Sequence, residues 1–250
     1  MIKFFRRIRQ NLLSEGKTGK YFKYAIGEII LVIIGILLAL QINNWNIKRL
    51  ENIRADNFIE QMKSQVEGNI LNVNENLQKY QSHLKVTEDL ISIIGTENTK
   101  DIDRKIDSLV SVNIYDYHLN LNMNTLIEGR ENGDLALIDS DSLRQSIYEL
   151  NTMYKHVSER ERIANQDLND FFIPYLNKAY NYRNGMIGFF NQNPQIGNSK
   201  IYKNDNLKML EDQEFENLII SRMIYNEDLI ANYNKLNEIL TLTLELLTNK

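Results

Sequence analysis

The sequence predicts an all-α protein with one N-terminal transmembrane helix followed by an antiparallel helical bundle. Three observations predict this fold. One apolar stretch near the N-terminus is long enough to cross a bilayer. Apolar residues recur at helical spacing along most of the remaining chain. The 250 residues include only two prolines and eleven glycines, the residues that interrupt helices. About 200 residues follow the span, enough for a single domain.

Residues 1–24 form a short basic segment with seven Lys and Arg residues and one Glu. Apolar residues at Ile2, Phe5 and Ile8 share one helical face, which predicts an amphipathic helix lying on anionic lipid headgroups. The positive-inside rule places this segment in the cytoplasm and the following domain outside it. We therefore expect a bacterial inner-membrane protein with a periplasmic domain. The predicted headgroup contacts are Lys3, Arg6, Arg7 and Arg9.

The predicted transmembrane helix spans residues 25–45. Residues 25–42 contain twelve large aliphatic side chains in eighteen positions. Aromatic rings prefer the two membrane interfaces, which fits Tyr21 and Tyr24 before the stretch and Trp45 after it. Tyr24 and Trp45 are 21 positions apart, or about 31 Å of helix. We expect an uncleaved signal anchor rather than a cleavable signal peptide, because no small-x-small cleavage motif follows the apolar core.

One face of the span has the composition of a helix-pairing surface. Small residues let a second helix approach closely, and a carboxyl group in the face can form a hydrogen bond across the contact. Three interpretations of Glu28 stay open: it snorkels to the interface of a lone anchor, it joins a helix pair, or it transfers protons. The face consists of Ala25, Glu28, Val32, Gly35 and Ala39.

The residues that open the chain resemble a known family. Residues 1–46 read MIKFFRRIRQNLLSEGKTGKYFKYAIGEIILVIIGILLALQINNWN. They resemble a large family of uncharacterised bacterial single-pass membrane proteins, known only as a domain of unknown function. Its signature is a basic MIKFFRxIR start, then GEI, an aliphatic run with IGIL and ALQ, and INNWN. Residues 124–150 resemble the family's second pattern, a Gly-containing turn before a helix that starts LI-x-D-x-x-LR. The resemblance implies the membrane topology and no activity.

The bundle, residues 46–250, is expected to begin with a long helix over about 47–94. Its narrow apolar seam resembles that of a coiled coil, although Gly68 and neighbouring asparagines weaken the helix. A short helix is predicted from Asp101 to about Val112. Residues 115–127 fit both alternating and helical spacing, and we interpret them as helix. The seam of the long helix is Ile59, Met62, Val66, Ile70, Val73, Leu77, Tyr80 and Leu84.

A second long helix is predicted over about 140–182. Gly129 and Gly133 indicate a turn before it, and Asp139 or Ser140 is expected to cap its N-terminus. Pro174 should kink or end it. Its seam is Leu143, Ile147, Leu150, Tyr154, Val157, Ala164, Leu168, Phe171 and Tyr175, with no apolar member at position 161.

A third long helix is predicted over about 212–247, after a loop over residues 184–198. Phe189 and Phe190 in that loop are expected to plug the end of the bundle rather than bind a ligand. Three long seamed helices predict a bundle. The seam of the third helix is Phe215, Ile219, Leu229, Tyr233, Leu236, Leu240 and Leu247.

The ionisable residues show no pattern typical of catalysis or metal binding. The chain has no cysteine, which excludes disulfides and thiol chemistry. The three histidines lack metal-ligand spacing, so solvated or hydrogen-bonded roles are expected. The charge run 159–162 is interpreted as a solvated helix face. A local acidic group lacks the calcium-loop pattern, and helix capping accounts for it better than cation binding. The three histidines are His83, His118 and His156. The acidic group consists of Glu128, Asp134, Asp139 and Asp141.

We therefore expect no enzyme activity, no catalytic residue, no metal and no cofactor. After residue 42 the chain carries 22 basic and 31 acidic residues, which argues against nucleic-acid binding. The expected partners are membrane lipid and either another protein or a second copy of the chain. The favoured function is an interaction or scaffold protein of the cell envelope. The alternative is an extracytoplasmic ligand-sensing bundle that signals through a partner, because 24 cytoplasmic residues cannot form an output domain.

Overall fold

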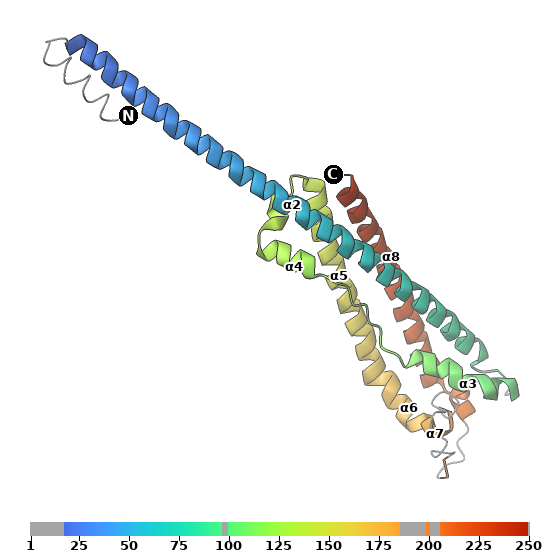
Figure 1. Ribbon diagram of the computed structural model, residues 1–250. Coiled ribbons are helices and arrows are strands. Elements are labelled where there is room, and N and C mark those ends of the chain that lie inside the picture. The colour runs from blue at the N-terminus through green and yellow to red at the C-terminus, as the bar shows by residue number, and fades with distance from the viewer. Residues whose placement is uncertain (1–17, 97–99, 186–198, 201–205, 250) are drawn as a thin grey trace. The chain divides into compact units, whose positions relative to one another are not determined.

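The computed structural model describes residues 18–96, 100–185, 199–200 and 206–249. These residues are mostly helical and contain no strand, which confirms the all-α prediction. The predicted headgroup contacts and the two loop phenylalanines lie outside the described residues. The elements are α2 (Thr18–Ile93), α3 (Lys100–Asn113), α4 (Asn124–Glu131), η1 (Asp134–Leu137), α5 (Asp141–Asp167), η2 (Leu168–Phe172), α6 (Ile173–Ala179), α7 (Tyr182–Gly185), η4 (Asn206–Glu211) and α8 (Gln213–Thr248) (Figure 1).

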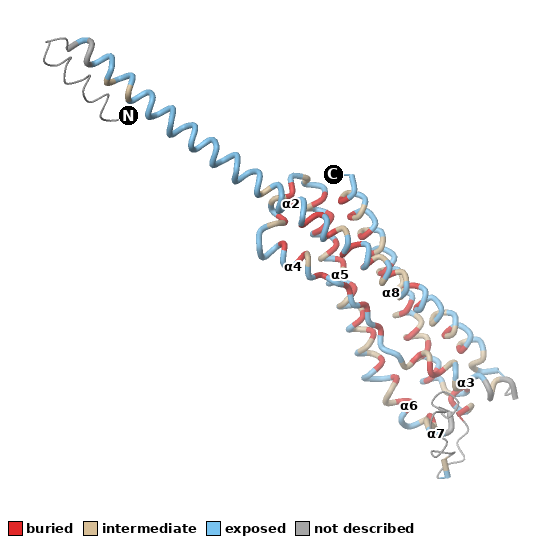
Figure 2. The backbone as a smooth tube through the Cα atoms, viewed as in Figure 1, coloured by how far each residue is buried: buried red, intermediate tan, exposed pale blue. Residues whose placement is uncertain are grey.

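The chain divides into two compact units, Met1–Asn57 and Phe58–Lys250, and α2 contributes residues to both. In the first unit, α2 contains an apolar stretch with a mean hydropathy of 2.6, none of which is buried (Figure 2). Among the described residues this is the one helix long and apolar enough to cross a membrane. The predicted anchor therefore corresponds to a real helix with exposed apolar side chains.

In the second unit, α2, α5 and α8 form a helical bundle (Figure 1). Helix α8 runs antiparallel to both of the others. Between α8 and α2, Asn226 Nδ2 donates to Tyr80 O at 3.1 Å and Asn237 Nδ2 donates to Asn74 Oδ1 at 3.1 Å, so residue numbers rise along α8 as they fall along α2. Helices α2 and α5 run in the same direction, because an extended segment after α3 returns the chain to the start of α4 (Figure 1).

The bundle core consists of two apolar clusters. The first joins α2, the extended segment, α5 and most of α8, and the second joins the end of α2 with α3, η2, α6, η4 and the start of α8. Buried polar residues lie between the clusters along the helices, such as Thr87 on α2 and Arg222 on α8. Nearly all predicted seam residues are buried or partly buried in this core.

The prediction of a helix over residues 115–127 is wrong for most of its length. Residues 115–123 are not helical. The backbone runs extended as far as Asn122, and Met123, with φ of −118° and ψ of 9°, is the N-cap residue of α4, which begins only at Asn124 (Figure 1). Burial alternates along the segment, with Tyr117, Leu119, Leu121 and Met123 buried and the residues between them exposed. This is the two-residue period of a strand. Hydrogen bonds from distant side chains, described below, hold the backbone in this form.

The two glycines of the predicted turn have different roles. Gly133 has φ of +79°, which confirms a turn there. Gly129 instead lies inside α4, where a Cβ atom would come within 2.1 Å of Phe58 Cε2. This glycine serves close packing rather than a turn. The predicted cap at Ser140 is confirmed, since its Oγ accepts a hydrogen bond from Leu143 N–H at 3.2 Å.

The second seam changes register near its end. Phe171 was predicted to face the core, but it is 60% exposed and Phe172 is buried in its place. The cause is the π-helical turn η2, in which Ile173 N–H bonds to Leu168 O, five residues back. The wider turn adds one residue to the helical repeat, so that Phe172 takes the buried position expected for Phe171. Pro174 then lies in the first turn of α6, where a missing N–H is tolerated, so the chain stays helical to Ala179.

Candidate functional site

The extended segment 115–123 lies between α2 and α5, and side chains from both helices bond to its backbone. Its odd-numbered residues bond to α5. Tyr117 N–H donates to Asn165 Oδ1 and Asn165 Nδ2 donates back to Tyr117 O, both at 2.8 Å. Leu119 N–H donates to the carboxyl of Glu161. Leu121 N–H donates to Tyr154 Oη at 3.4 Å. These side chains replace the neighbouring strand that an isolated extended segment lacks.

The even-numbered residues bond to α2 in the same manner. His118 N–H donates to Tyr80 Oη at 2.9 Å, and Asn72 Nδ2 donates to Asn120 O at 2.7 Å. Asn122 N–H donates to Asn69 Oδ1 at 2.9 Å, and Asn69 Nδ2 donates back to Asn122 O at 2.8 Å. Two extended residues rise about 6.6 Å, close to the 5.4 Å helical pitch, so helix side chains can follow the segment.

A buried polar network lies under the segment. Glu161, only 5% exposed, accepts a hydrogen bond from Tyr233 Oη as well as the one from Leu119. The Tyr233 ring stacks on Tyr80 with centroids 5.3 Å apart. Burial raises the pKa of Glu161, although the two hydrogen bonds act in the opposite direction. Burial also raises the pKa of Tyr233 and of Tyr80.

Arg222 ties the start of the segment to α5 and α8. The side chain is 2% exposed. Its Nη1 donates to Ala164 O at 3.2 Å and its Nη2 donates to Tyr115 O at 3.0 Å. Its Cζ lies 4.7 Å from the centroid of the Tyr117 ring, a cation–π contact. Burial lowers the pKa of the guanidinium. The bonds to backbone carbonyls assign Arg222 to holding the segment.

The interpretation of residues 159–162 as a solvated face is wrong for one of them. Glu159 and Arg162 are exposed and form an ion pair at 2.7 Å, and Arg160 Nε bonds to Asp228 at 2.8 Å. Glu161, however, points into the core. The sequence did contain a signal for this: position 161 is the missing member of the second seam. A polar residue at a core-facing seam position can indicate a buried hydrogen-bond network, and not only an interruption of the apolar packing.

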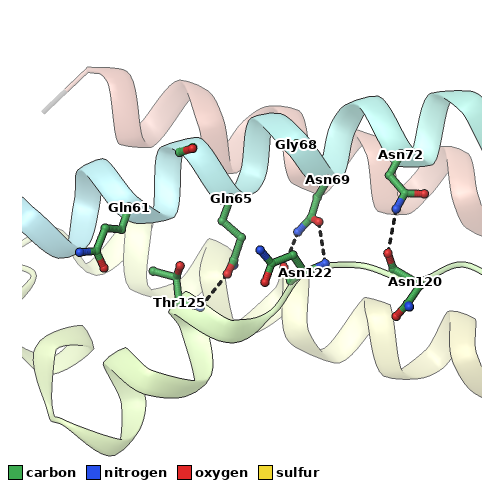
Figure 3. Close-up of a pocket in the computed structure, with 9 residues that line it drawn as sticks. Gln61, Gln65, Gly68, Asn69, Asn72, Asn120, Asn122 and Thr125 are labelled. Atoms are coloured by element: carbon green, nitrogen blue, oxygen red, sulfur yellow. Dashed lines mark hydrogen bonds between the residues drawn. The ribbon is translucent and has the colours of Figure 1, made fainter.

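Figure 3 shows a groove between α2 and the extended segment, here called the amide groove, with a volume of about 490 Å³. None of its lining residues is charged or aromatic. Gln65, Asn69 and Asn72 reach from α2 to the segment, and Gln65 Oε1 accepts from Thr125 N–H at 2.7 Å (Figure 3). The lining residues are Gln61, Ser64, Gln65, Gly68, Asn69, Asn72, Asn120, Asn122 and Thr125.

Part of this lining is available to a ligand. Among the described residues, no partner is found for the side-chain amides of Gln61 and Asn120 or for the hydroxyl of Ser64, and all three residues are exposed. The Oδ1 of Asn122 accepts from Asn124 N–H at 3.0 Å, which leaves its Nδ2 free. From the sequence, the asparagines near Gly68 are expected only to weaken the helix. A row of amide side chains on one helix face was the signal for this groove.

The predicted face of the span lies on α2 in the first unit. Because this part of α2 is uninterrupted helix, the 3-4 spacing places its five residues on one face. Tyr24 and Trp45, the predicted interface anchors, are 55% and 68% exposed. Tyr21 lies in the same helix. These positions fit an anchor, and their lipid and pairing roles stay predictions.

The predicted ionisable groups are dispersed over the bundle. His118 and His156 are exposed. His83 is half-buried, with its ring 5.9 Å from that of Tyr80, and burial together with Lys79 and Arg222 lowers its pKa. Among the residues that the structure describes, no cluster of three His, Asp or Glu side chains could hold a metal ion.

Comparisons with protein-family models, with curated proteins and with solved structures give no match to this chain. The resemblance of residues 1–46 to an uncharacterised family therefore stays an expectation, and no activity is carried over from it. In the part of the chain that the structure describes, the fold is a helical bundle with one helix long and apolar enough to cross a membrane.

Proposed function

We propose that this chain is an interaction protein anchored in the inner membrane of the bacterial cell envelope. The exposed apolar stretch of α2 carries the proposal. From Ile29 to Leu40, every large aliphatic side chain is about half exposed or more. Exposed apolar surface costs about 25 cal/mol per Å² in water, and lipid removes that cost. The resemblance of residues 1–46 to single-pass membrane proteins supports the same topology.

The contrast between the buried network and the amide groove supports binding rather than catalysis. Glu161, Tyr233 and Arg222 already use polar atoms to hold the extended segment. The groove, in contrast, presents free amides and a hydroxyl at the surface. Neutral amides bind partners through hydrogen bonds, and they are poor nucleophiles and proton donors. The bundle is therefore suited to recognise another molecule.

The orientation is tested with reporters fused after Lys250. A reporter that is active only outside the cytoplasm should be active, because the basic residues of segment 1–24 stay inside. A reporter that is active only in the cytoplasm should be silent. Deleting residues 1–45 should reverse both results. Cytoplasmic activity of the intact fusion would contradict the proposed topology.

The interaction itself is tested by crosslinking in intact cells, followed by affinity capture through a C-terminal tag and mass spectrometry. We expect one envelope protein in constant ratio to the chain. Deleting residues 1–45 should abolish its recovery, since the deleted chain stays in the cytoplasm. Repeated recovery of the chain alone would contradict an interaction with a different protein and favour self-association.

One observation favours the alternative of a ligand-sensing bundle. The groove volume of about 490 Å³ lies in the range of 300–1,000 Å³ found for small-molecule sites. A thermal-shift screen of the purified full chain against a metabolite library discriminates the two functions. A ligand at 100 times its Kd would stabilise the fold by about 2.7 kcal/mol. No shift across the library would favour the interaction protein.

A further inference from the structure

We infer that the amide groove binds an extended, uncharged stretch of a partner's polypeptide chain. This inference rests on the proposed interaction function and names the chemistry of the partner. The groove lies between α2 and the extended segment (Figure 3). It is lined by side chains from both, so an occupant would lie beside a chain segment that is itself extended.

The molecule already holds an extended chain by the chemistry that we propose. The amide of Asn69 both donates to and accepts from the backbone of Asn122, and the amide of Asn165 does the same with Tyr117. An Asn or Gln side chain carries one acceptor and two donors, so it can match the N–H and C=O of one extended residue. The free amides of the groove can therefore bind a second extended backbone in the same way.

The available groups are spread along the groove. Gln61 and Ser64 lie toward one end of its α2 wall, and Asn120 and the free Nδ2 of Asn122 belong to the opposite wall. From Gln61 to Asn72, α2 rises about 16 Å. At about 3.3 Å per residue, this length accommodates roughly five extended residues. A short linear stretch of a partner therefore fits the spacing of the donors and acceptors.

Gly68 leaves open space on the α2 wall of the groove. It lies in the interior of a long helix, where glycine is less favourable than alanine. A Cβ atom at this position would meet nothing within 4 Å, so packing within the bundle does not require glycine. A glycine that the fold does not need, in the wall of a groove, leaves room for the backbone of a bound chain.

The composition of the lining selects the class of occupant. With no Lys or Arg in the lining, the groove lacks the cations that bind phosphate-rich ligands. With no aromatic ring, it also lacks the platform on which nucleic-acid bases stack. An uncharged peptide segment needs neither, because its backbone amides pair with neutral side-chain amides.

The inference is tested by photo-crosslinking with the full chain in cells. A benzophenone amino acid is placed at Gln61 in the groove and, as a matched control, at Gln78, an exposed glutamine of α2 outside the groove. We expect an adduct from position 61 and none from position 78. Mass spectrometry of the adduct should map to an extended segment without charged residues. A carbohydrate adduct, or a charged or helical peptide, would overturn the inference.

Two substitutions connect the adduct to the groove. With the photo-probe at Ser64, Gly68→Leu should abolish the adduct, because its side chain fills the space beside α2, and a thermal melt checks that the variant is folded. With the same probe, Gln61→Ala should lower the adduct yield about fivefold, the effect of one lost hydrogen bond, while Gln78→Ala should leave it unchanged. An adduct that survives Gly68→Leu would show that the groove is not the site.

Different results would refute the groove as the binding site and the interaction function itself. Adducts from Gln78 without any from Gln61 would leave the interaction function standing and refute the groove as its site. No protein adduct from either position, with no partner captured by crosslinking in cells, would refute the interaction function as well.

Discussion

Glu161 is an acidic residue inside the core of the bundle. It is buried beside two tyrosines, and burial raises its pKa above the ordinary value of 4.5. The folded state therefore holds the proton more tightly than the unfolded chain does. Glu161 contributes stability that is complete below pH 4.5 and that is lost as the pH rises through its folded pKa.

We predict that Glu161→Gln makes the fold less sensitive to rising pH. A glutamine oxygen can accept from Tyr233 and from Leu119 N–H without the cost of a buried charge. The free energy of unfolding of the variant, relative to that of the original chain, should rise between pH 4.5 and pH 7 in urea titrations.

The neighbouring exposed glutamate provides the control. The hydrogen bond from Arg162 lowers the pKa of Glu159, so the stability that Glu159 contributes is lost as the pH falls through its folded pKa. Glu159→Gln should therefore show no gain with rising pH. If both variants followed the original chain in parallel at every pH, Glu161 would not be the group responsible.

Gly68→Ala is predicted to stabilise the fold by about 0.5–1 kcal/mol, because alanine is the better residue in a helix interior and the added Cβ meets no neighbour. Chemical denaturation of the two chains measures the difference. The matched control is Gly133→Ala, which should destabilise by about 1 kcal/mol because Gly133 has φ of +79°. A loss of stability in Gly68→Ala would show that the fold itself requires this glycine.

Among the elements, the extended segment 115–123 depends most on distant side chains. Asn165 satisfies both the N–H and the C=O of Tyr117, a residue that is 4% exposed. We predict that Asn165→Ala lowers the free energy of unfolding by about 2–4 kcal/mol, since two backbone groups lose their partner. Asn169→Ala should cost much less, because that exposed side chain bonds only to a carbonyl of its own helix. Equal losses in denaturant titrations would contradict the role of Asn165.

The segment also shows why this element could not be predicted from the local sequence. Leu119 and Leu121 alternate like strand residues, while Leu119, Met123 and Leu126 have helical spacing. The deciding partners are Asn165 and Asn69, which lie 48 and 53 positions away from the residues they bind. Only the folded bundle brings these amides to the backbone. The π-helical turn before Pro174 was likewise invisible, because no local pattern distinguishes it from a regular turn.

At the scale of the whole chain, apolar periodicity was sufficient to predict the fold class and the three long helices. Apolar burial dominates the packing of a helix, and its 3.6-residue period is visible in one sequence. The candidate site was not visible in that pattern. The amide groove consists of polar residues outside the apolar seams. The buried network is centred on Glu161, the position at which the second seam lacks an apolar residue. Pairings of polar groups depend on which helices meet, which a single sequence does not specify.

The membrane segment allows a last prediction, that Glu28→Leu leaves the chain in the membrane fraction. The twelve large aliphatic residues of the span each contribute about −0.3 to −0.6 kcal/mol to insertion, so insertion does not depend on position 28. The same variant tests the predicted pairing face. Chemical crosslinking in membranes measures the yield of dimer for Glu28→Leu and for Gly35→Leu. The second substitution blocks close approach of another helix on that face.

Ile30→Leu, on the opposite side of the helix, is the control for that experiment and should change neither insertion nor dimer yield. A joint loss of dimers in Glu28→Leu and Gly35→Leu would assign the face to helix pairing, with the carboxyl bonding across the contact. Unchanged crosslinking in both would assign α2 to anchoring alone, with Glu28 reaching the interface. A chain that left the membrane in Glu28→Leu would contradict the prediction, because removing a charge from an apolar helix can only favour lipid.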